Sequence, residues 1–136
     1  IAGVATAGIA QGALVAEAMG LPFLYVRSAS KGHGLANQIE GKLVKGQKIV
    51  LIEDLVSTGG SSLAAVDALR EAGADTLGMA AIFTYAFGIA EQNFKAKNIP
   101  LVVLSDYPTL VSISNFDKET SELLSQWRES PDTWGK

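Results

Sequence analysis

The chain reads IVLIEDLVSTGGSS from Ile49 to Ser62, and this stretch decides the fold class. It opens with four consecutive aliphatic residues, three of them β-branched, which is typical of a strand buried on both faces in a parallel sheet. Two acids, Glu53 and Asp54, follow at the end of this strand, and a turn of glycines and small hydroxyl residues leads into a helix. The order strand, turn, helix predicts one unit of an α/β domain.

The same order repeats on both sides of this stretch. Apolar runs predict strands at residues 1–4, 21–26, 49–52, 77–85 and 101–104. Spacing and composition predict helices over residues 8–19, 62–72, 89–96 and 117–128. Strands that alternate with helices form an open parallel sheet with helices on both faces. Residues 1–136 are therefore expected to form a single α/β domain.

The composition excludes several classes of function. Lys and Arg number 11 against 14 Asp and Glu, and this net charge of −3 argues against a nucleic-acid partner, which requires a basic surface. Without cysteine, the chain has no disulfide framework, thiolate nucleophile or cysteine zinc site, and oxygen ligands would favour Mg²⁺ as a bound metal. No bilayer-spanning run or leader is visible, so a cytoplasmic protein without a membrane partner is expected.

The turn between the strand and the helix has the composition of an anion site. Its glycines let backbone N–H groups close around a phosphate, and the helix N-terminus adds a partial positive charge. Glu53 and Asp54 would repel a bare anion, so the better ligand carries a phosphate at one end and hydroxyls at the other, as ribose 5-phosphate does. The alternative is a plain strand, turn and helix with polar caps. Neither Gly-x-x-x-x-Gly-Lys-Ser/Thr nor Gly-x-Gly-x-x-Gly occurs in the sequence.

Residues 49–62 resemble the phosphoribosyl pyrophosphate signature of type I phosphoribosyltransferases, in which two acids separate an aliphatic strand from a Thr/Ser-Gly loop. The resemblance implies that Glu53 and Asp54 hold the ribose hydroxyls, directly or through Mg²⁺. It also implies that Mg²⁺ is held mainly by the substrate, with no direct metal site on the protein. Residues 57–61 would cradle the 5-phosphate. The substrate-binding residues after the acids are then Leu55, Val56, Ser57, Thr58, Gly59, Gly60 and Ser61.

A second stretch, YVRSASKGHG from Tyr25 to Gly34, is similar to the flexible catalytic loop of orotate phosphoribosyltransferases. By that resemblance Arg27, Lys31 and His33 are catalytic residues that meet the pyrophosphate, and the loop reaches into the neighbouring subunit of a homodimer. The residues alone indicate cations on a glycine-hinged loop that closes over a polyanion. They leave open a solvated basic loop with an ordinary exposed histidine. The wider segment, residues 28–46, has four glycines and predicts a long mobile loop.

Two further segments agree with this resemblance. The stretch GVATAGI, residues 3–9, resembles the pyrophosphate loop of the family, in which the backbone of Thr6, Ala7 and Gly8 would bind the ligand. The strand end at Tyr85 resembles that of some bacterial orotate enzymes. The chain departs from the family where Ser28 and Ala7 replace common lysines, and no arginine closely follows Tyr85, where some members use one to bind orotate. An N-terminal part, which forms a hood over the base in the family, is expected to be missing.

The implied reaction transfers ribose 5-phosphate from phosphoribosyl pyrophosphate to orotate, and gives orotidine 5-monophosphate and pyrophosphate. Catalysis would be mainly positioning and charge stabilisation, with Asp54 sharing in orientation or proton acceptance. One alternative is a purine phosphoribosyltransferase, which would share residues 53–61 but lack the Arg-x-x-x-Lys-x-His loop. A second is a regulator that senses phosphoribosyl pyrophosphate without catalysis. A third is an α/β domain without small-molecule chemistry.

Overall fold

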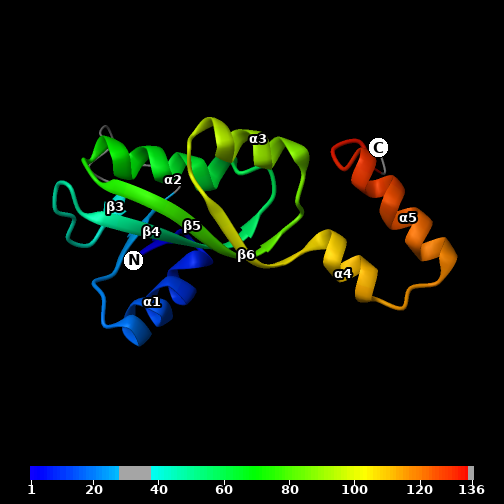
Figure 1. Cartoon of the computed structure of the whole chain (residues 1–136), viewed down its shortest axis with the longest axis horizontal. Helices are drawn as coiled ribbons and strands as arrows, with labels where there is room; N and C mark the ends of the chain where they lie inside the picture. The colour runs from blue at the N-terminus through cyan, green and yellow to red at the C-terminus, as the bar shows by residue number, and fades with distance from the viewer. Residues whose placement is uncertain (28–37, 135–136) are drawn as a thin grey trace.

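The computed structural model describes residues 1–27 and 38–134 of the chain, and its centre is a six-stranded sheet (Figure 1). The strand order is β3-β2-β1-β4-β5-β6. All neighbouring pairs are parallel except β2 and β3. The strands are β1 (Ala2–Val4), β2 (Leu24–Val26), β3 (Ile39–Glu40), β4 (Lys48–Val56), β5 (Asp75–Thr84) and β6 (Leu101–Asp106).

Helices cover both faces of the sheet. Helix α1 (Gly8–Met19) packs on one face against β1 and β4. Helices α2 (Gly60–Glu71) and α3 (Gly88–Ala96) lie together on the other face. Helices α4 (Tyr107–Ile113) and α5 (Lys118–Glu129) follow β6 and extend beyond the carboxyl end of the sheet (Figure 1). The expected open α/β sheet with helices on both faces is confirmed.

The core explains why the aliphatic run of β4 predicted a central strand. Ile49, Leu51 and Val56 of β4 are all buried, and they pack in one cluster with residues of α2 and β5. Strand β4 has a parallel neighbour on each side, β1 and β5, so its main-chain groups are paired along both edges. The strand therefore provides a rigid support for the residues at its carboxyl end.

Three details differ from the sequence expectation. Strand β4 continues to Val56, which pairs with Thr84, so the two acids lie inside the strand and not after it. The segment predicted as one long loop contains β3, whose two residues pair antiparallel with β2 and are too few to show a period. Helix α4 was missed because its seven residues carry little helical pattern, although Asp106 caps it by accepting a hydrogen bond from the Thr109 amide.

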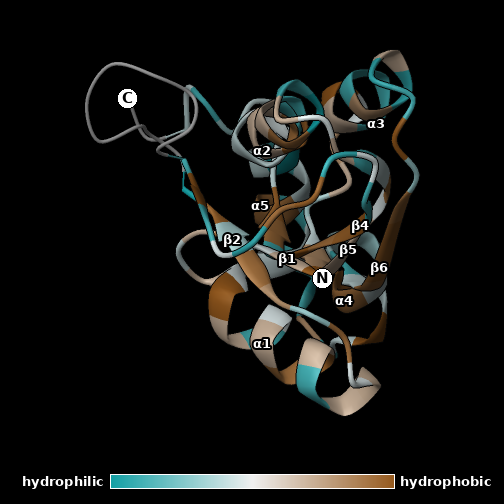
Figure 2. Ribbon diagram, turned by 90° about the vertical axis from the view of Figure 1, so that its left-hand side faces the viewer, coloured by the Kyte–Doolittle hydropathy of each residue, from teal (hydrophilic) through white to brown (hydrophobic). Residues whose placement is uncertain are grey.

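On the face of the sheet where α1 packs against β1 and β4, the described part of β5 and β6 is apolar and exposed. Ile82 and Leu104 are neighbours across the two strands, and Leu104 is 82% exposed. Val102, on the same face of β6, is 65% exposed. Figure 2 shows β6 in the brown of hydrophobic residues along the edge of the sheet. Within the described part of the chain, none of the helices combines the length and apolar character needed to cross a membrane.

Candidate functional site

Three connections meet at the carboxyl edge of the sheet. They follow β1, β4 and β5, which are adjacent and parallel, so residues 5–7, 57–59 and 85–87 lie along one edge. Hydrogen bonds join these connections to neighbouring strands. The Ala5 amide donates to the Val26 carbonyl at 2.8 Å, and the Tyr85 amide donates to the Val56 carbonyl at 3.1 Å. The edge is therefore one continuous surface built from loops on a rigid sheet.

The loop between β4 and α2 is held from behind by α3. Gly59 has φ +84°, and a Cβ there would lie 2.8 Å from the ring of Phe94. The Asn93 side chain donates a hydrogen bond from Nδ2 to the Thr58 carbonyl at 3.0 Å. Gly59 is also the N-cap of α2. Because glycine has no side chain to cap the helix, no side chain accepts a capping hydrogen bond from the first amides of α2, which face the loop. The arrangement suits an anion at the start of α2.

Glu53 and Asp54 occupy different environments although they are adjacent. Glu53 is only 4% exposed; its Oε2 accepts a hydrogen bond from the Ser62 hydroxyl at 2.9 Å, and its Oε1 accepts one from the Asp54 amide at 3.1 Å. Burial raises the pKa of Glu53 from 4.5 to about 7, and the nearby Asp54 carboxyl adds to this increase. Asp54 is half-buried at the next position of the strand. The two carboxyl groups therefore differ in their access to a ligand.

The connection between β1 and α1 brings small residues against this strand. Thr6 and Ala7 are exposed, and the peptide bond between Ala5 and Thr6 is cis. Gly8 begins α1 so close to β4 that a Cβ on it would lie 2.5 Å from the Ile52 carbonyl oxygen. A side chain at this position would push the helix away. The glycine therefore sets the distance between the residue 5–7 loop and the acids of β4.

The structure brings together most of the residues predicted for substrate binding. Residues 6–8 and 53–61 lie on neighbouring elements at the same edge. The Val56 side chain is buried, and its carbonyl accepts hydrogen bonds from Tyr85 and Thr84, which places this residue in the scaffold. Leu55 is 37% exposed. Contact of these residues with a ligand stays a prediction.

The predicted catalytic loop falls largely outside the described residues. Lys31 and His33 lie in residues 28–37, which the structure does not describe. Arg27 is described, and its Nη1 forms an ion pair with Oε1 of Glu40 on β3 at 3.3 Å. Its amide donates to the Gln38 carbonyl at 2.8 Å. Arg27 is thus anchored at the edge of the sheet, and the contact of all three cations with pyrophosphate stays a prediction.

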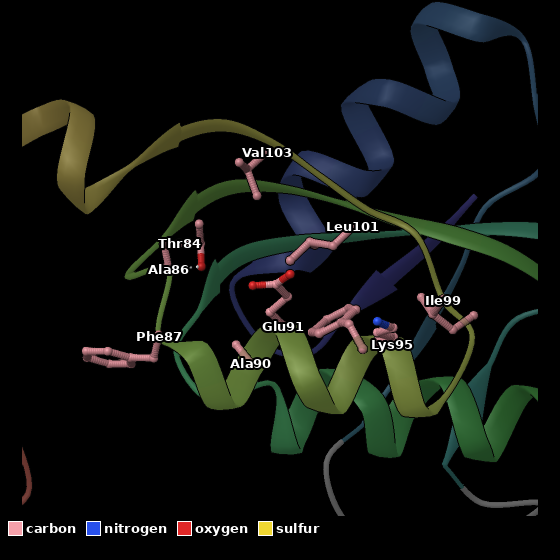
Figure 3. Close-up of a pocket in the computed structure, with 10 residues that line it drawn as sticks. Thr84, Ala86, Phe87, Ala90, Glu91, Lys95, Ile99, Leu101 and Val103 are labelled. Carbon is pink, nitrogen blue, oxygen red and sulfur yellow. Dashed lines mark hydrogen bonds between the residues drawn. The ribbon is translucent and has the colours of Figure 1, made fainter.

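A separate cleft of about 370 Å³ lies between α3 and the last two strands (Figure 3). Apolar side chains dominate its lining, with Glu91 and Lys95 of α3 as its charged members. In Figure 3 the Glu91 side chain extends from α3 toward the strands, while the Phe87 ring points away to the side. None of the predicted site residues within the described ranges lines this cleft, but Ala86 and Phe87 of the turn after β5 do, so the cleft borders the carboxyl edge.

The family follows from a comparison of the whole chain. The model of the phosphoribosyl transferase domain matches residues 1–111, which include every predicted site residue. The chain belongs to the phosphoribosyl transferase domain family. Its fold matches the solved orotate phosphoribosyltransferase of Aeropyrum pernix with a TM-score of 0.74, at 30% identity over 82% of this chain and 62% of that one.

Two other proteins similar to this phosphoribosyl transferase domain are informative. The orotate phosphoribosyltransferase of Cytophaga hutchinsonii is 55% identical over 100% of this chain and 67% of its own length. A solved orotate phosphoribosyltransferase of Mycobacterium tuberculosis, in complex with 5-phospho-alpha-D-ribosyl 1-diphosphate, is 26% identical, with a TM-score of 0.61 over 79% of this chain and 61% of that one. The chain spans about two thirds of the length of the curated relatives it matches.

The fold also brings an arginine to the turn after β5, where the order of the sequence gave none. No arginine closely follows Tyr85 in the sequence, but Arg128 of α5 donates hydrogen bonds from Nη1 to the Tyr85 carbonyl and from Nη2 to the Ala86 carbonyl. The sequence showed Arg128 only as the last residue of an amphipathic pattern. A contact across more than forty residues leaves no trace in local periodicity, and neither does the bond from Asn93 to the Thr58 carbonyl.

Proposed function

We propose that this chain is the part of an orotate phosphoribosyltransferase that binds phosphoribosyl pyrophosphate and performs the transfer to orotate. The observation that carries the proposal is the identity of about half of all residues to bacterial orotate phosphoribosyltransferases over essentially the whole chain. The geometry of the carboxyl edge supports it, because an anion site and a carboxylate pair stand side by side there.

The arrangement of the edge supports a proposed place for each part of the substrate. The 5-phosphate lies on residues 57–61 at the start of α2, where backbone amides and the helix dipole favour an anion. The half-buried Asp54 accepts hydrogen bonds from the ribose hydroxyls. Glu53, whose oxygens are already bonded to Ser62 and to the Asp54 amide, holds the backbone of Asp54 in place and is the weaker candidate for direct contact.

The residues at this edge fit Mg²⁺ only as an ion carried by the substrate. Among the described residues there is no group of three or more acidic or histidine side chains that would hold a metal. The carboxylate of Asp54, with the support of Glu53, would complete the coordination of an ion bound to ribose and pyrophosphate oxygens. When bound, Mg²⁺ supplies positive charge that stabilises the departing pyrophosphate.

The reaction requires little covalent chemistry from the protein. A ring nitrogen of orotate forms a bond to C1 of the ribose while the bond from C1 to the pyrophosphate oxygen breaks. The electron pair of that bond leaves with pyrophosphate, and the proton of the ring nitrogen would pass to Asp54 or to water. Backbone amides of residues 6–8 would hold the leaving group on the β1 side of the site. The cations Arg27, Lys31 and His33 would neutralise its charge. Positioning of the two reactants supplies most of the acceleration.

A spectrophotometric assay tests the proposal. Full-length protein is mixed with phosphoribosyl pyrophosphate, Mg²⁺ and orotate, and the loss of orotate absorbance is followed, with adenine, guanine and uracil as parallel substrates. Consumption of orotate alone is expected. Consumption of a purine base would replace the substrate assignment. Binding of phosphoribosyl pyrophosphate without consumption of any base would overturn catalysis and favour a regulator.

The roles of Asp54 and Lys31 are separable by substitution. We expect Asp54→Asn to weaken binding of phosphoribosyl pyrophosphate, because the amide oxygen lacks the charge that the ribose hydroxyls and Mg²⁺ require. Lys31→Ala is expected to lower kcat by about a hundredfold or more, which is typical of the loss of one charge-stabilising group. Normal kcat/KM in both variants would contradict these roles.

We further propose that the enzyme is a homodimer in which the loop from Arg27 to Gly34 serves the site of the partner. Mixing subunits tests this directly. A dimer of one Asp54→Asn subunit and one Lys31→Ala subunit has one site with both defects and one site with neither if the loop acts across the interface. Activity should therefore reappear when the two inactive variants are mixed. If activity does not reappear in verified mixed dimers, the loop serves the site of its own subunit.

A further inference from the structure

Helix α5 is fixed to the turn that follows β5 by a single arginine. The guanidinium of Arg128 donates to the carbonyls of Tyr85 and Ala86, the second at 2.8 Å. Its central carbon lies 5.6 Å from the ring centroid of Phe87 and 5.5 Å from that of Tyr107. The planar group is therefore bound through its edge to two carbonyls and through its faces to aromatic rings.

The turn that Arg128 holds has an unusual backbone. Ala86 has φ +52°, in the left-handed region that residues with a Cβ seldom adopt. The Ala86 amide donates to the Thr84 hydroxyl at 3.0 Å, and that hydroxyl donates to the Val56 carbonyl at 3.0 Å. The start of the turn is thus tied to the phosphate-loop strand β4. Its far side, the carbonyls of Tyr85 and Ala86, is tied to α5.

The turn of residues 85–87 lies on the side of the proposed site from which the base approaches. Displacement at C1 of the ribose places the incoming base and the outgoing pyrophosphate on opposite sides of the sugar. The loop assigned to pyrophosphate follows β1, and the ribose phosphate site follows β4 between β1 and β5. The turn after β5 is therefore on the side opposite the pyrophosphate, where the base approaches.

We propose that Arg128 is a positioning residue for the base: it holds the turn of residues 85–87 in the conformation that receives orotate. The inference rests on the proposed function and extends it to a helix outside the family match at residues 1–111. Both Nη groups of Arg128 already donate to carbonyls, so the residue acts through the turn. The C-terminal helix thereby becomes part of the specificity of the site.

Steady-state kinetics of two arginine variants test the proposal. Arg128→Ala should raise the KM for orotate about tenfold, as expected when a charge-assisted contact is lost, and change the KM for phosphoribosyl pyrophosphate less than about twofold. Arg128→Lys should give an intermediate KM, because an ammonium group cannot bridge two carbonyls in a plane. Equal changes in the two KM values, or no change in either, would overturn the proposal.

Arg70→Ala is the matched control. Arg70 also joins a helix to distant elements, through bonds to the Thr76 hydroxyl at 2.8 Å and to the Lys97 carbonyl at 2.9 Å. These partners lie at the start of β5 and the end of α3, away from the carboxyl edge. Arg70→Ala should lower Tm about as much as Arg128→Ala and leave both KM values unchanged. If it raises the orotate KM to the same extent, the effect of Arg128 is general destabilisation.

Tryptophan fluorescence provides a readout that does not depend on turnover. The chain has two tryptophans, Trp127 and Trp134, and the ring of Trp127 lies 5.6 Å from Tyr85 and 5.2 Å from Tyr107. In a Trp134→Phe background, Arg128→Ala should shift Trp127 emission to longer wavelength as α5 leaves the turn. Orotidine 5-monophosphate should change the emission of the Arg128 protein, and much less that of the alanine variant.

These experiments distinguish a failure of the proposed function from a failure of the role of Arg128. If wild-type protein does not consume orotate, the proposed function fails, and the same KM comparison is made with the base that the enzyme accepts. If wild-type protein consumes orotate and Arg128→Ala has normal KM values and unchanged Trp127 emission, the role of Arg128 fails alone.

Discussion

Among the described residues, Glu53 has a pKa far from its ordinary value. It lies 4% exposed beneath the site, and burial raises its pKa to about 7. Since the pKa in the folded state exceeds that in the unfolded state, the folded protein binds the extra proton. The stabilisation is complete below pH 4.5 and is lost as the pH rises through about 7. This carboxylate therefore costs the fold most above about pH 7, where it is ionised.

Glu53→Gln removes that cost while it keeps an oxygen for the Ser62 hydroxyl. We expect wild-type protein to lose roughly 2–3 kcal/mol of unfolding free energy between pH 5 and pH 8 through this group, and the variant to lose none of it. Urea unfolding at the two pH values measures the difference. The exposed Glu71→Gln serves as control and should behave as wild type. Parallel pH profiles for wild type and Glu53→Gln would contradict the prediction.

Gly59 is required both by its backbone angle and by its neighbour. With φ +84° and Phe94 at 2.8 Å from any added Cβ, Gly59→Ala should cost at least about 1–2 kcal/mol and displace the phosphate loop. Thermal unfolding should show a Tm lower by several degrees, and the KM for phosphoribosyl pyrophosphate should rise. Gly60→Ala is the control for thermal unfolding alone, because the nearest atom to its Cβ would be 3.9 Å away. An equal loss of Tm in both variants would refute this account of the loop.

At the scale of elements, α3 supports the loop between β4 and α2, which is proposed to bind the 5-phosphate. Its Asn93 side chain donates a hydrogen bond to the Thr58 carbonyl of this loop at 3.0 Å. Asn93→Ala should raise the KM for phosphoribosyl pyrophosphate about two- to fivefold, as expected for one neutral hydrogen bond. The neighbouring exposed Gln92→Ala makes the same change to helix composition and should have no effect. Isothermal titration with phosphoribosyl pyrophosphate would reveal the same contrast.

The elements that the sequence predicted are those with a strong local pattern. Helix α1 was predicted with its observed bounds, because its alanine-rich run ends at Gly20, which adopts the left-handed C-cap conformation. Strand β3 and helix α4 were not predicted, since two and seven residues are too short to establish a period. The acids of β4 were placed on the correct strand, but the strand continued past them through its pairing with β5.

For the molecule as a whole, the site was predictable to the extent that it follows strand order. Parallel strands carry their connections to one edge, so residues 6–8 and 53–61 were expected together and lie together. The contacts made by residues far away in the sequence were not predictable. Arg128 and Asn93 reach the site through tertiary packing of α5 and α3, and the sequence carries no local sign of either contact.

The exposed apolar face of β5 and β6 predicts that residues 1–136 self-associate in solution. Leu104, 82% exposed on an edge strand, offers an apolar surface and unpaired main-chain groups to other chains. Leu104→Lys should reduce self-association measured by light scattering and change the unfolding free energy by less than about 0.5 kcal/mol. Ser105→Lys adds the same charge without removal of apolar surface. If Ser105→Lys is equally effective, charge and not the apolar face is responsible.

The packing of α3 against the loop between β4 and α2 lowers the entropic cost of binding a ligand there. A loop held by Phe94 and Asn93 before any ligand arrives has already lost its conformational entropy during folding. Binding of a phosphate group there requires little further ordering, so even small fragments such as ribose 5-phosphate should bind with a modest entropic penalty. Under the proposed function, the loop would therefore be a preorganised receptor for the 5-phosphate of the substrate.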